Sequence, residues 1–182
     1  MDDHVEEVIL VDLEDREIGR AAKIPAHALG YLHRAISVCV VDAEGRMLLQ
    51  RRAAGKYHSA GLWTNACCTH PHPGETVDHA AVRRLQEELA ATCPLRFLAR
   101  THYQAPVGGL LRENEVVHLF LGSYAGDVRP NPDEVEAFAW KSRDNLLADI
   151  ASKPDAYTYW FRHYLESFGE EIYRRSGASG AG

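Results

Sequence analysis

Cysteine, histidine and glutamate side chains that could do chemistry gather in one short stretch, residues 63–75, which reads WTNACCTHPHPGE. Two cysteines stand side by side, and two histidines follow within four residues. This composition fits a zinc clasp, a pair of redox thiols or a catalytic site. Adjacent thiols and two nearby prolines give one short segment poor tetrahedral geometry, which argues against the zinc clasp. Neighbouring Cys67 and Cys68 also cannot easily bridge each other.

The residues after this stretch follow a helical pattern. Apolar side chains recur at four-residue steps on one face, at Val77, Ala81, Leu85 and Leu89. Acidic residues at the start suit the helix dipole. A loop that feeds a helix carrying carboxylates suits Mg²⁺ shared with a diphosphate, because Mg²⁺ takes few protein carboxylates and keeps substrate oxygens. A solvated helix face of mixed charge is the alternative interpretation from the residues alone.

The same region resembles the Nudix signature, whose core is GE, seven residues, then RE-U-x-EE-x-G, where U is apolar. Here Gly74-Glu75 is followed after seven residues by RRLQEEL. Thr69, Arg84 and Ala90 stand where the signature has glycine, glutamate and glycine. Nudix hydrolases use the missing carboxylate in the metal cluster that activates water. A cation in its place favours holding a phosphate, so the resemblance implies a Nudix scaffold that binds a diphosphate without hydrolysing it.

Six separated segments together resemble one family, the type 1 isopentenyl-diphosphate isomerases, over roughly Glu7 to Leu165. They are KIPAHALGYLHRA, RRAAGK, GLWTNACCTHP, RRLQEEL, ENEV and YTYW. The resemblance implies interconversion of isopentenyl diphosphate and dimethylallyl diphosphate, a 1,3 proton shift through a tertiary carbocation in isoprenoid biosynthesis. A Nudix pyrophosphohydrolase acting on a nucleotide diphosphate is the alternative, and Arg84 argues against it.

The resemblance also assigns residues that hold metal. The family's metal site matches His27, His33, His70, Glu113 and Glu115. Such a set suits a divalent ion, Mn²⁺, Zn²⁺ or Mg²⁺. A second ion, Mg²⁺, is expected to bridge the substrate's diphosphate and Glu88.

Catalysis and substrate binding are assigned in the same way. Counting from Trp63 places the family's catalytic cysteine at Cys68, and Glu115 with Tyr103 is its proton-transfer partner. Trp160 offers an aromatic face to the carbocation. Core packing remains the alternative for Tyr103 and for Trp160. The positions that hold the diphosphate match Lys23, Arg52, Lys56 and Arg84.

The other candidate residues receive structural interpretations. Cys67 is expected to pack in the core, since adjacent strand residues face opposite sides. His72 is expected to be an exposed loop residue. Arg51 and Arg83 are interpreted as solvated or structural. His118, three residues past Glu115, should point to the opposite face of a strand. No role is assigned to the remaining histidines, which are His4, His58, His79, His102 and His163.

The elements that must position these residues are strands mixed with a few helices. Strands or hairpins are predicted over residues 7–19, 35–52, 61–68, 95–107, 115–126 and 130–142. Helices are predicted over 75–90, 142–152 and 156–175, with Pro94 breaking the first. The expected fold class is α+β, an α/β sandwich with a Nudix-like mixed sheet flanked by helices. Residues 1–175 are expected to form one domain and 176–182 a flexible tail.

Composition excludes several other classes of function. The formal net charge of −6 gives no global basic field for nucleic acid or a membrane surface. No apolar run approaches the ~18–20 residues of a membrane span, and the acidic N-terminus does not resemble a signal peptide. Four cysteines without a spaced framework favour reduced thiols and a cytoplasmic location. The partner that the family resemblance implies is a small-molecule diphosphate, and the protein is expected to be a monomer or weak dimer.

Overall fold

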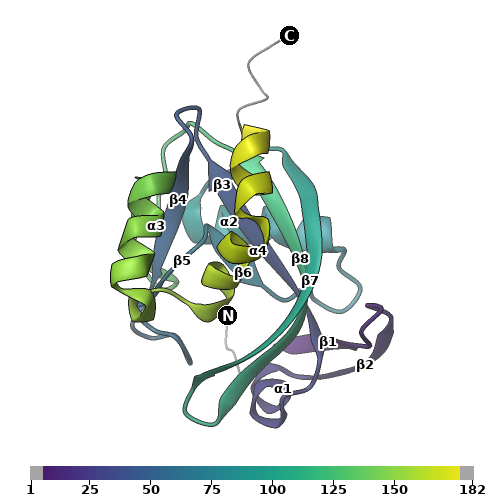
Figure 1. Ribbon diagram of the computed structural model, residues 1–182. Coiled ribbons are helices and arrows are strands. Elements are labelled where there is room, and N and C mark those ends of the chain that lie inside the picture. Colours follow the sequence, from purple (N-terminus) through teal and green to yellow (C-terminus); the bar gives the residue numbers. More distant parts are fainter. Residues whose placement is uncertain (1–5, 177–182) are drawn as a thin grey trace.

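The computed structural model describes residues 6–176, and its elements are shown in Figure 1. The N-terminal third contains β1 (Glu7–Val11), β2 (Glu17–Ala22), α1 (Lys23–Leu29), β3 (His33–Val41) and β4 (Arg46–Arg52). The middle contains β5 (Trp63–Thr64), β6 (Cys67–Thr69), α2 (Val77–Leu89), β7 (Leu95–Gly108) and β8 (Leu111–Ser123). The last part contains β9 (Val135–Ser142), α3 (Arg143–Ser152), a 3₁₀ turn (Pro154–Ala156) and α4 (Tyr159–Ser176).

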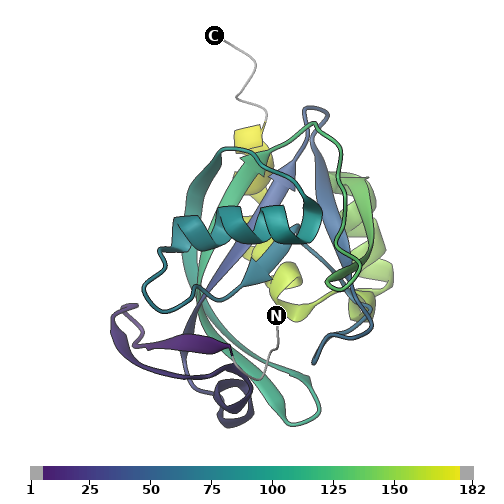
Figure 2. The same ribbon diagram turned by 180° about the vertical axis from the view of Figure 1, so that it is seen from behind.

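Helices cover both faces of the mixed sheet. Figure 1 shows α4 in front of the strands, and Figure 2, from behind, shows α2 across the other face. The central strand β3 divides its side chains accordingly. Ile36 and Val38 pack in the cluster that includes Leu85 of α2, whereas Ala35 and Cys39 pack in the cluster that includes residues of α3 and α4. Successive side chains of a strand point to opposite faces of the sheet, so β3 packs against helices on both sides. This arrangement confirms the predicted sandwich.

The predicted hairpin over residues 35–52 was only partly right. Its strands pair with each other at Val41 and Met47 and then diverge. Strand β3 continues as a parallel partner of β8, while β4 pairs antiparallel with β9. The wedge between them receives the stretch predicted as one strand over 61–68, which is instead two short strands. Strand β5 pairs with β4 and β6 pairs with β3, so Cys68 is placed at the opening of the wedge.

Strands β7 and β8 form a long antiparallel hairpin that extends towards α1 (Figure 1). Its register places Tyr103 opposite Glu115 and Ala105 opposite Glu113. The parallel pairing of β3 with β8 places His33 opposite Glu115. These pairings bring His33 and Tyr103 onto the strands on either side of the one that carries Glu113 and Glu115.

Helices α2 and α4 differ from the sequence prediction at their ends. Helix α2 ends at Leu89, because Ala90 adopts a left-handed conformation (φ 49°) as its C-cap; Pro94 is therefore not what stops it. Helix α4 begins at Tyr159 rather than residue 156, after the 3₁₀ turn. It continues to Ser176, the first residue of the predicted tail. Residues 177–182 of that tail, and His4, lie outside the described residues. Within residues 6–176, none of the helices is long and apolar enough to cross a membrane.

Candidate active site and metal centre

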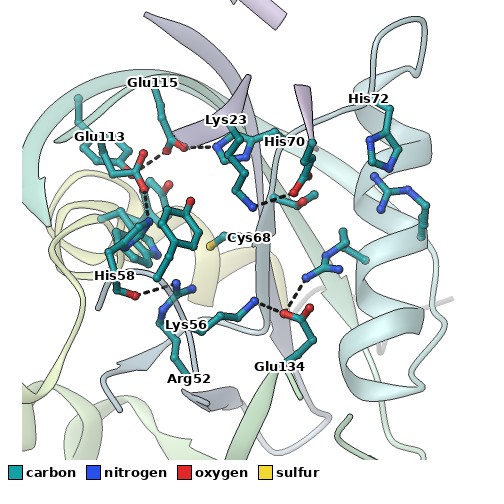
Figure 3. Close-up of a pocket in the computed structure, with 18 residues that line it drawn as sticks. Lys23, Arg52, Lys56, His58, Cys68, His70, His72, Glu113, Glu115 and Glu134 are labelled. Carbon is teal, nitrogen blue, oxygen red and sulfur yellow. Dashed lines mark hydrogen bonds and ion pairs between the residues drawn. The ribbon is translucent and has the colours of Figure 1, made fainter. Parts of the chain in front are cut away.

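A cavity of about 730 Å³, open mouth included, lies where β6, the β7–β8 hairpin, α1 and α4 meet. Ten of the residues predicted for the site line it. Figure 3 shows Glu113, Glu115 and His70 at one end, Arg52 and Lys56 at the other, and Cys68 between. The predicted residues that line the cavity are Lys23, Arg52, Lys56, Cys68, His70, Arg84, Tyr103, Glu113, Glu115 and Trp160.

Five buried side chains at one end form the cluster that could hold a metal ion. Each offers one ligand atom, and these atoms all lie within 4.8 Å of one another. His70 Nε2 is 3.0 Å from Glu115 Oε1, and His27 Nε2 is 3.1 Å from Glu113 Oε2. The members come from α1, from β3, from the loop after β6 and from β8; they are His27, His33, His70, Glu113 and Glu115.

This cluster fits a divalent ion. His33 Nε2 and Glu113 Oε2 are buried and have no hydrogen-bond partner among the described residues. Because buried polar atoms are normally hydrogen-bonded, these two atoms are suited to coordinate an ion. The other ring nitrogens of His27 and His33 meet the carbonyl oxygens of Lys23 and Tyr31 at 2.7 and 2.8 Å. Those contacts fix the rings with Nε2 towards the cluster, which is the usual arrangement behind metal-binding histidines.

The protonation states of Glu113, Glu115 and His70 also suit metal binding. Burial opposes ionisation of Glu113, but the nearby imidazoles of His27 and His58 hold its pKa well below the usual glutamate value. The pKa of Glu115 is lowered as well, although burial and Glu113 oppose it, because His33 and His70 lie close. Burial lowers the pKa of His70 to about 4. Ionised carboxylates and a neutral imidazole are the forms that bind metal.

Cys68 lies in the middle of the cavity, and Cys67 does not reach it. Cys67 is fully buried with α2 residues such as Leu85 on the other side of the sheet. Cys68 Sγ is 2.9 Å from Ser37 Oγ. Burial raises the pKa of Cys68 to about 12, although hydrogen bonds with Ser37 and Asn65 oppose the shift. The thiol therefore carries its proton at neutral pH.

Asn65 fixes the surroundings of that thiol. Its Nδ2 donates to Ser37 Oγ and to the carbonyl oxygens of Val38 and Cys67, each at 2.9–3.0 Å. Its Oδ1 accepts from Thr64 at 3.0 Å and lies 3.4 Å from Cys68 Sγ. Sequence reasoning missed Ser37 and Asn65. Asparagine is depleted in strands, so Asn65 inside the strand predicted over 61–68 is the signal that could have found the second.

The proposed proton-transfer partner also has defined hydrogen bonds. Tyr103 donates from its hydroxyl to Glu115 Oε2 at 2.7 Å. Burial, with Glu115 adding to it, raises the pKa of Tyr103 well above its usual value. The indole N–H of Trp160 donates to Thr64 Oγ1 at 2.9 Å, which anchors the ring at the cavity wall. Tyr103 and Trp160 therefore both line the cavity and pack in the core, so the two interpretations of each residue are compatible.

The cations that line the cavity are mostly paired with carboxylates. Lys23 Nζ is 2.8 Å from Glu6, Lys56 contacts Glu134, and Arg84 lies 2.6 Å from Glu88 and 3.1 Å from Glu134. Sequence reasoning missed Glu6 and Glu134, since no spacing in the chain links them to these cations.

Arg52 differs from the other cations that line the cavity. It donates to the carbonyl oxygen of His58 at 3.1 Å, and its Nε is buried with no hydrogen-bond partner in the described part of the chain. Its guanidinium lies 5.4 Å from the ring centre of Trp160. The neighbouring Arg51 instead donates to the carbonyl oxygen of Gly61. Arg83, next to Arg84, pairs with Glu75 at 2.7 Å.

Two sequence expectations do not match the geometry. Glu88, expected to meet Mg²⁺ at the diphosphate, is not among the residues that line the cavity. Both of its carboxylate oxygens accept hydrogen bonds, one from Arg84 and the other from Gln50. His72, expected to be exposed, is half-buried and borders the cavity near α2 (Figure 3).

The remaining histidines divide into outer contacts and one missed cavity residue. His118 lies 2.7 Å from Asp15, away from Glu115 as predicted. His79 is exposed on α2. His58 lines the cavity with its Nε2 3.0 Å from Glu113 Oε1, and nothing in its sequence spacing indicates that contact.

The NUDIX domain matches residues 31–161 of the chain. The structure is similar to that of DR0079 from Deinococcus radiodurans (TM-score 0.68, 22% identity, 81% of this chain and 90% of that one). It is also similar to a MutT protein from Methanosarcina mazei (TM-score 0.63, 19% identity, 77% and 94%). Fold and matched domain together define a NUDIX protein.

Two curated relatives are much more similar in sequence. One is isopentenyl-diphosphate Delta-isomerase 1 of Aromatoleum aromaticum, 49% identical over 161 residues, with 88% of this chain and 91% of the relative covered. The other is isopentenyl-diphosphate Delta-isomerase of Burkholderia multivorans, 45% identical over 170 residues, with 93% and 97% covered. The chain belongs to the isopentenyl-diphosphate Delta-isomerase family.

Proposed function

We propose that this enzyme interconverts isopentenyl diphosphate and dimethylallyl diphosphate in isoprenoid biosynthesis. One observation carries the proposal: a protonated thiol, Cys68, and an ionised carboxylate, Glu115, line the same cavity. A 1,3 proton shift needs one group that gives a proton to the alkene and another that removes a different proton. The relatives' names support the same reaction.

In the forward direction, the Cys68 thiol gives its proton to the terminal alkene carbon and leaves a thiolate and a tertiary carbocation. Glu115 then takes a proton from the carbon on the other side of the cation, which forms the new double bond. The hydroxyl of Ser37, 2.9 Å from Sγ, stabilises the thiolate by hydrogen bonding. Tyr103 orients the accepting carboxylate. The two groups regain their starting protonation states when protons exchange with solvent.

Trp160 stabilises the intermediate. An indole face is the strongest aromatic partner for a positive centre, contributing about 2 kcal/mol when desolvated. Because Trp160 is 3% exposed and anchored to Thr64, its ring also keeps water away from the cation. A divalent ion on the five-residue cluster would supply positive charge that tunes the basicity of Glu115. We propose Mn²⁺, Zn²⁺ or Mg²⁺ in that role.

The diphosphate is held by four cations that line the cavity, Lys23, Arg52, Lys56 and Arg84. Arg52 has an unpartnered buried Nε that suits a phosphate oxygen. The proposed Mg²⁺ contact of Glu88 requires Arg84 to leave that carboxylate, and a phosphate within reach gives Arg84 a competing partner.

A cytoplasmic location is supported by the four cysteines, which are all free thiols. We expect a monomer or weak dimer.

The test is an isomerisation assay with isopentenyl diphosphate and Mg²⁺ in deuterated water, followed by NMR. Cys68→Ala should lower kcat by about a thousandfold or more, since it removes the proton donor. The matched control, Cys67→Ala, should retain activity within about threefold and lose some stability, because its thiol only fills the core. The reverse pattern would contradict the assignment of Cys68. Release of phosphate from nucleoside diphosphates by the wild type would overturn the isomerase proposal.

A further inference from the structure

His58 is a buried imidazole that the mechanism above does not use. It lies in the loop between β4 and β5, is 7% exposed, and faces the cavity (Figure 3). Its Nε2 is 3.0 Å from Glu113 Oε1. The other oxygen of that carboxylate, Oε2, is the one near His27 and His33, and it has no hydrogen-bond partner within residues 6–176. The two oxygens of Glu113 therefore face different partners.

At 3.0 Å this contact is short enough for a hydrogen bond, and the chemistry of the two groups gives its direction. An ionised carboxylate oxygen can only accept, so Nε2 of His58 carries the proton. Nδ1 of the same ring lies 3.1 Å from Ser59 Oγ and can accept from that hydroxyl. One neutral tautomer thus satisfies both ring nitrogens. The backbone of His58 is also held, because its carbonyl oxygen accepts from Arg52 at 3.1 Å.

We propose that His58 is a positioning residue for the metal centre: its Nε2–H binds Glu113 Oε1 and leaves Oε2 as the single oxygen that Glu113 offers to the ion. This proposal rests on the proposed metal site. It adds a residue behind that site, one that contacts the ion only through Glu113. The effect is to fix the carboxylate's rotation and to keep it a one-oxygen ligand. Partners of this kind typically change metal affinity by about 10–100-fold.

The same ring connects the metal centre to the rest of the cavity. The imidazole packs at right angles to the Trp160 ring, with 5.9 Å between ring centres, and the backbone carbonyl oxygen of His58 accepts a hydrogen bond from Arg52. Loop 53–62 therefore carries one residue that touches the metal ligand Glu113, the aromatic wall and a diphosphate-binding arginine. Replacement of His58 should act first on Glu113, because that contact is the only one made by the imidazole's Nε2 among the ion pairs and hydrogen bonds of the described residues.

The experiment measures Mn²⁺ affinity of the metal-free protein by titration calorimetry and by electron paramagnetic resonance of free Mn²⁺. His58→Leu should weaken Mn²⁺ binding about 10–100-fold, and His58→Ala is the second variant if leucine prevents folding. His58→Gln keeps an N–H near the position of Nε2 and should stay within about threefold of the wild type. His79→Leu, on the exposed face of α2, is the matched control and should leave the affinity unchanged.

The outcomes separate this inference from the proposed function. If the wild type binds no Mn²⁺, Zn²⁺ or Mg²⁺ at the cluster, the metal site itself fails. If the wild type binds metal and a folded His58→Leu or His58→Ala binds it equally well, the positioning role fails. If a folded His58→Gln binds Mn²⁺ as weakly as the leucine variant, the N–H···O bond does not determine the metal affinity, and the inference is overturned. Circular dichroism and thermal unfolding without metal verify the fold of each variant.

Discussion

The two ends of the cavity hold charge in different ways. At the metal end, five ligand atoms already converge within 4.8 Å, and two of them lack hydrogen-bond partners among residues 6–176. At the cation end, Lys56 and Arg84 share Glu134, and Arg84 also holds Glu88. Lys23, which lies nearer the metal end (Figure 3), holds Glu6. The metal end is arranged to receive an ion as it stands. The cation end must exchange internal partners for a ligand.

This difference has an energetic consequence. A preformed site loses little free energy to rearrangement on binding, so its affinity reflects its ligands directly. A cation paired with a carboxylate must give up that interaction when a diphosphate arrives, which subtracts from the observed affinity. In return, the pairs avoid leaving several half-buried cations without partners in the free enzyme. Arg52, which pairs with no carboxylate within the described residues, is the one cation here ready for phosphate.

The largest effect that this contrast between the two ends predicts is at the metal end. His33→Leu should weaken binding of a divalent ion more than about 100-fold, because it removes a ligand rather than a supporting partner. Without metal the variant should lose only about 1 kcal/mol of stability, for the lost contact with the Tyr31 carbonyl. Thermal unfolding with and without Mn²⁺ measures both quantities. The wild type should gain about 2.7 kcal/mol at an ion concentration 100 times Kd.

His118→Leu is the matched control for this measurement, since His118 lies on β8 but contacts Asp15 on the other side of the sheet. Its metal-dependent stabilisation should equal that of the wild type. If His33→Leu kept the full stabilisation, the converging atoms would not be the metal site, and the contrast between the two ends would disappear.

A smaller effect is expected at the cation end. Glu134→Gln removes the negative charge that Lys56 and Arg84 share, so inorganic pyrophosphate should bind about fivefold tighter, or about 1 kcal/mol. Calorimetric titration with pyrophosphate measures this. Glu136→Gln is the control, because Glu136 is half-exposed and pairs at 3.6 Å with Arg51, outside the cavity. Weaker binding in Glu134→Gln would mean that Glu134 holds the cations in place for phosphate rather than competing with it.

The sequence predicted local features better than distant ones. Helix α2 and its buried face followed from residues four apart, such as Leu85 and Leu89, which depend only on helix geometry. The five-residue cluster was collected through family resemblance, since spacing cannot show that the parallel pairing of β3 and β8 places His33 beside Glu115. The prediction that β3 and β4 pair as a hairpin was wrong over most of their length for the same reason. Local turn chemistry indicates a hairpin, whereas distant strands decide how far it pairs.

Partners of the predicted residues were the least predictable part of the site. Ser37 meets Cys68 across 31 positions of sequence and Lys56 meets Glu134 across 78. Neither contact leaves a periodic or composition signal, because each depends on how elements pack together. The expected contact of Glu88 with Mg²⁺ also depends on packing that the sequence does not show. A motif can indicate that a glutamate faces a phosphate site, but it cannot show that Arg84, one helical turn earlier, occupies the carboxylate in the free protein.

The smallest predicted effect concerns pH and sharpens the description of the cation end. Burial opposes ionisation of Glu134, but Arg84 and Lys56 outweigh it and lower the pKa of this carboxyl group. Because the folded-state pKa lies below that of the unfolded chain, the group contributes stability above the ordinary value of 4.5. That contribution is lost as pH falls through the folded-state pKa. Glutamine cannot titrate, so the wild type should exceed Glu134→Gln in stability by a constant amount between pH 5.5 and 7.

Below about pH 4.5 this stability gap should narrow, because protonation of Glu134 removes the same charge as the mutation does. Urea unfolding of both proteins at several values between pH 3.5 and 7 measures the gap directly, and the other carboxylates cancel in the comparison. A gap that stays constant down to pH 3.5 would show that Arg84 and Lys56 do not stabilise the ionised carboxylate. The cations would then be as free to receive a ligand as the metal-binding atoms at the other end.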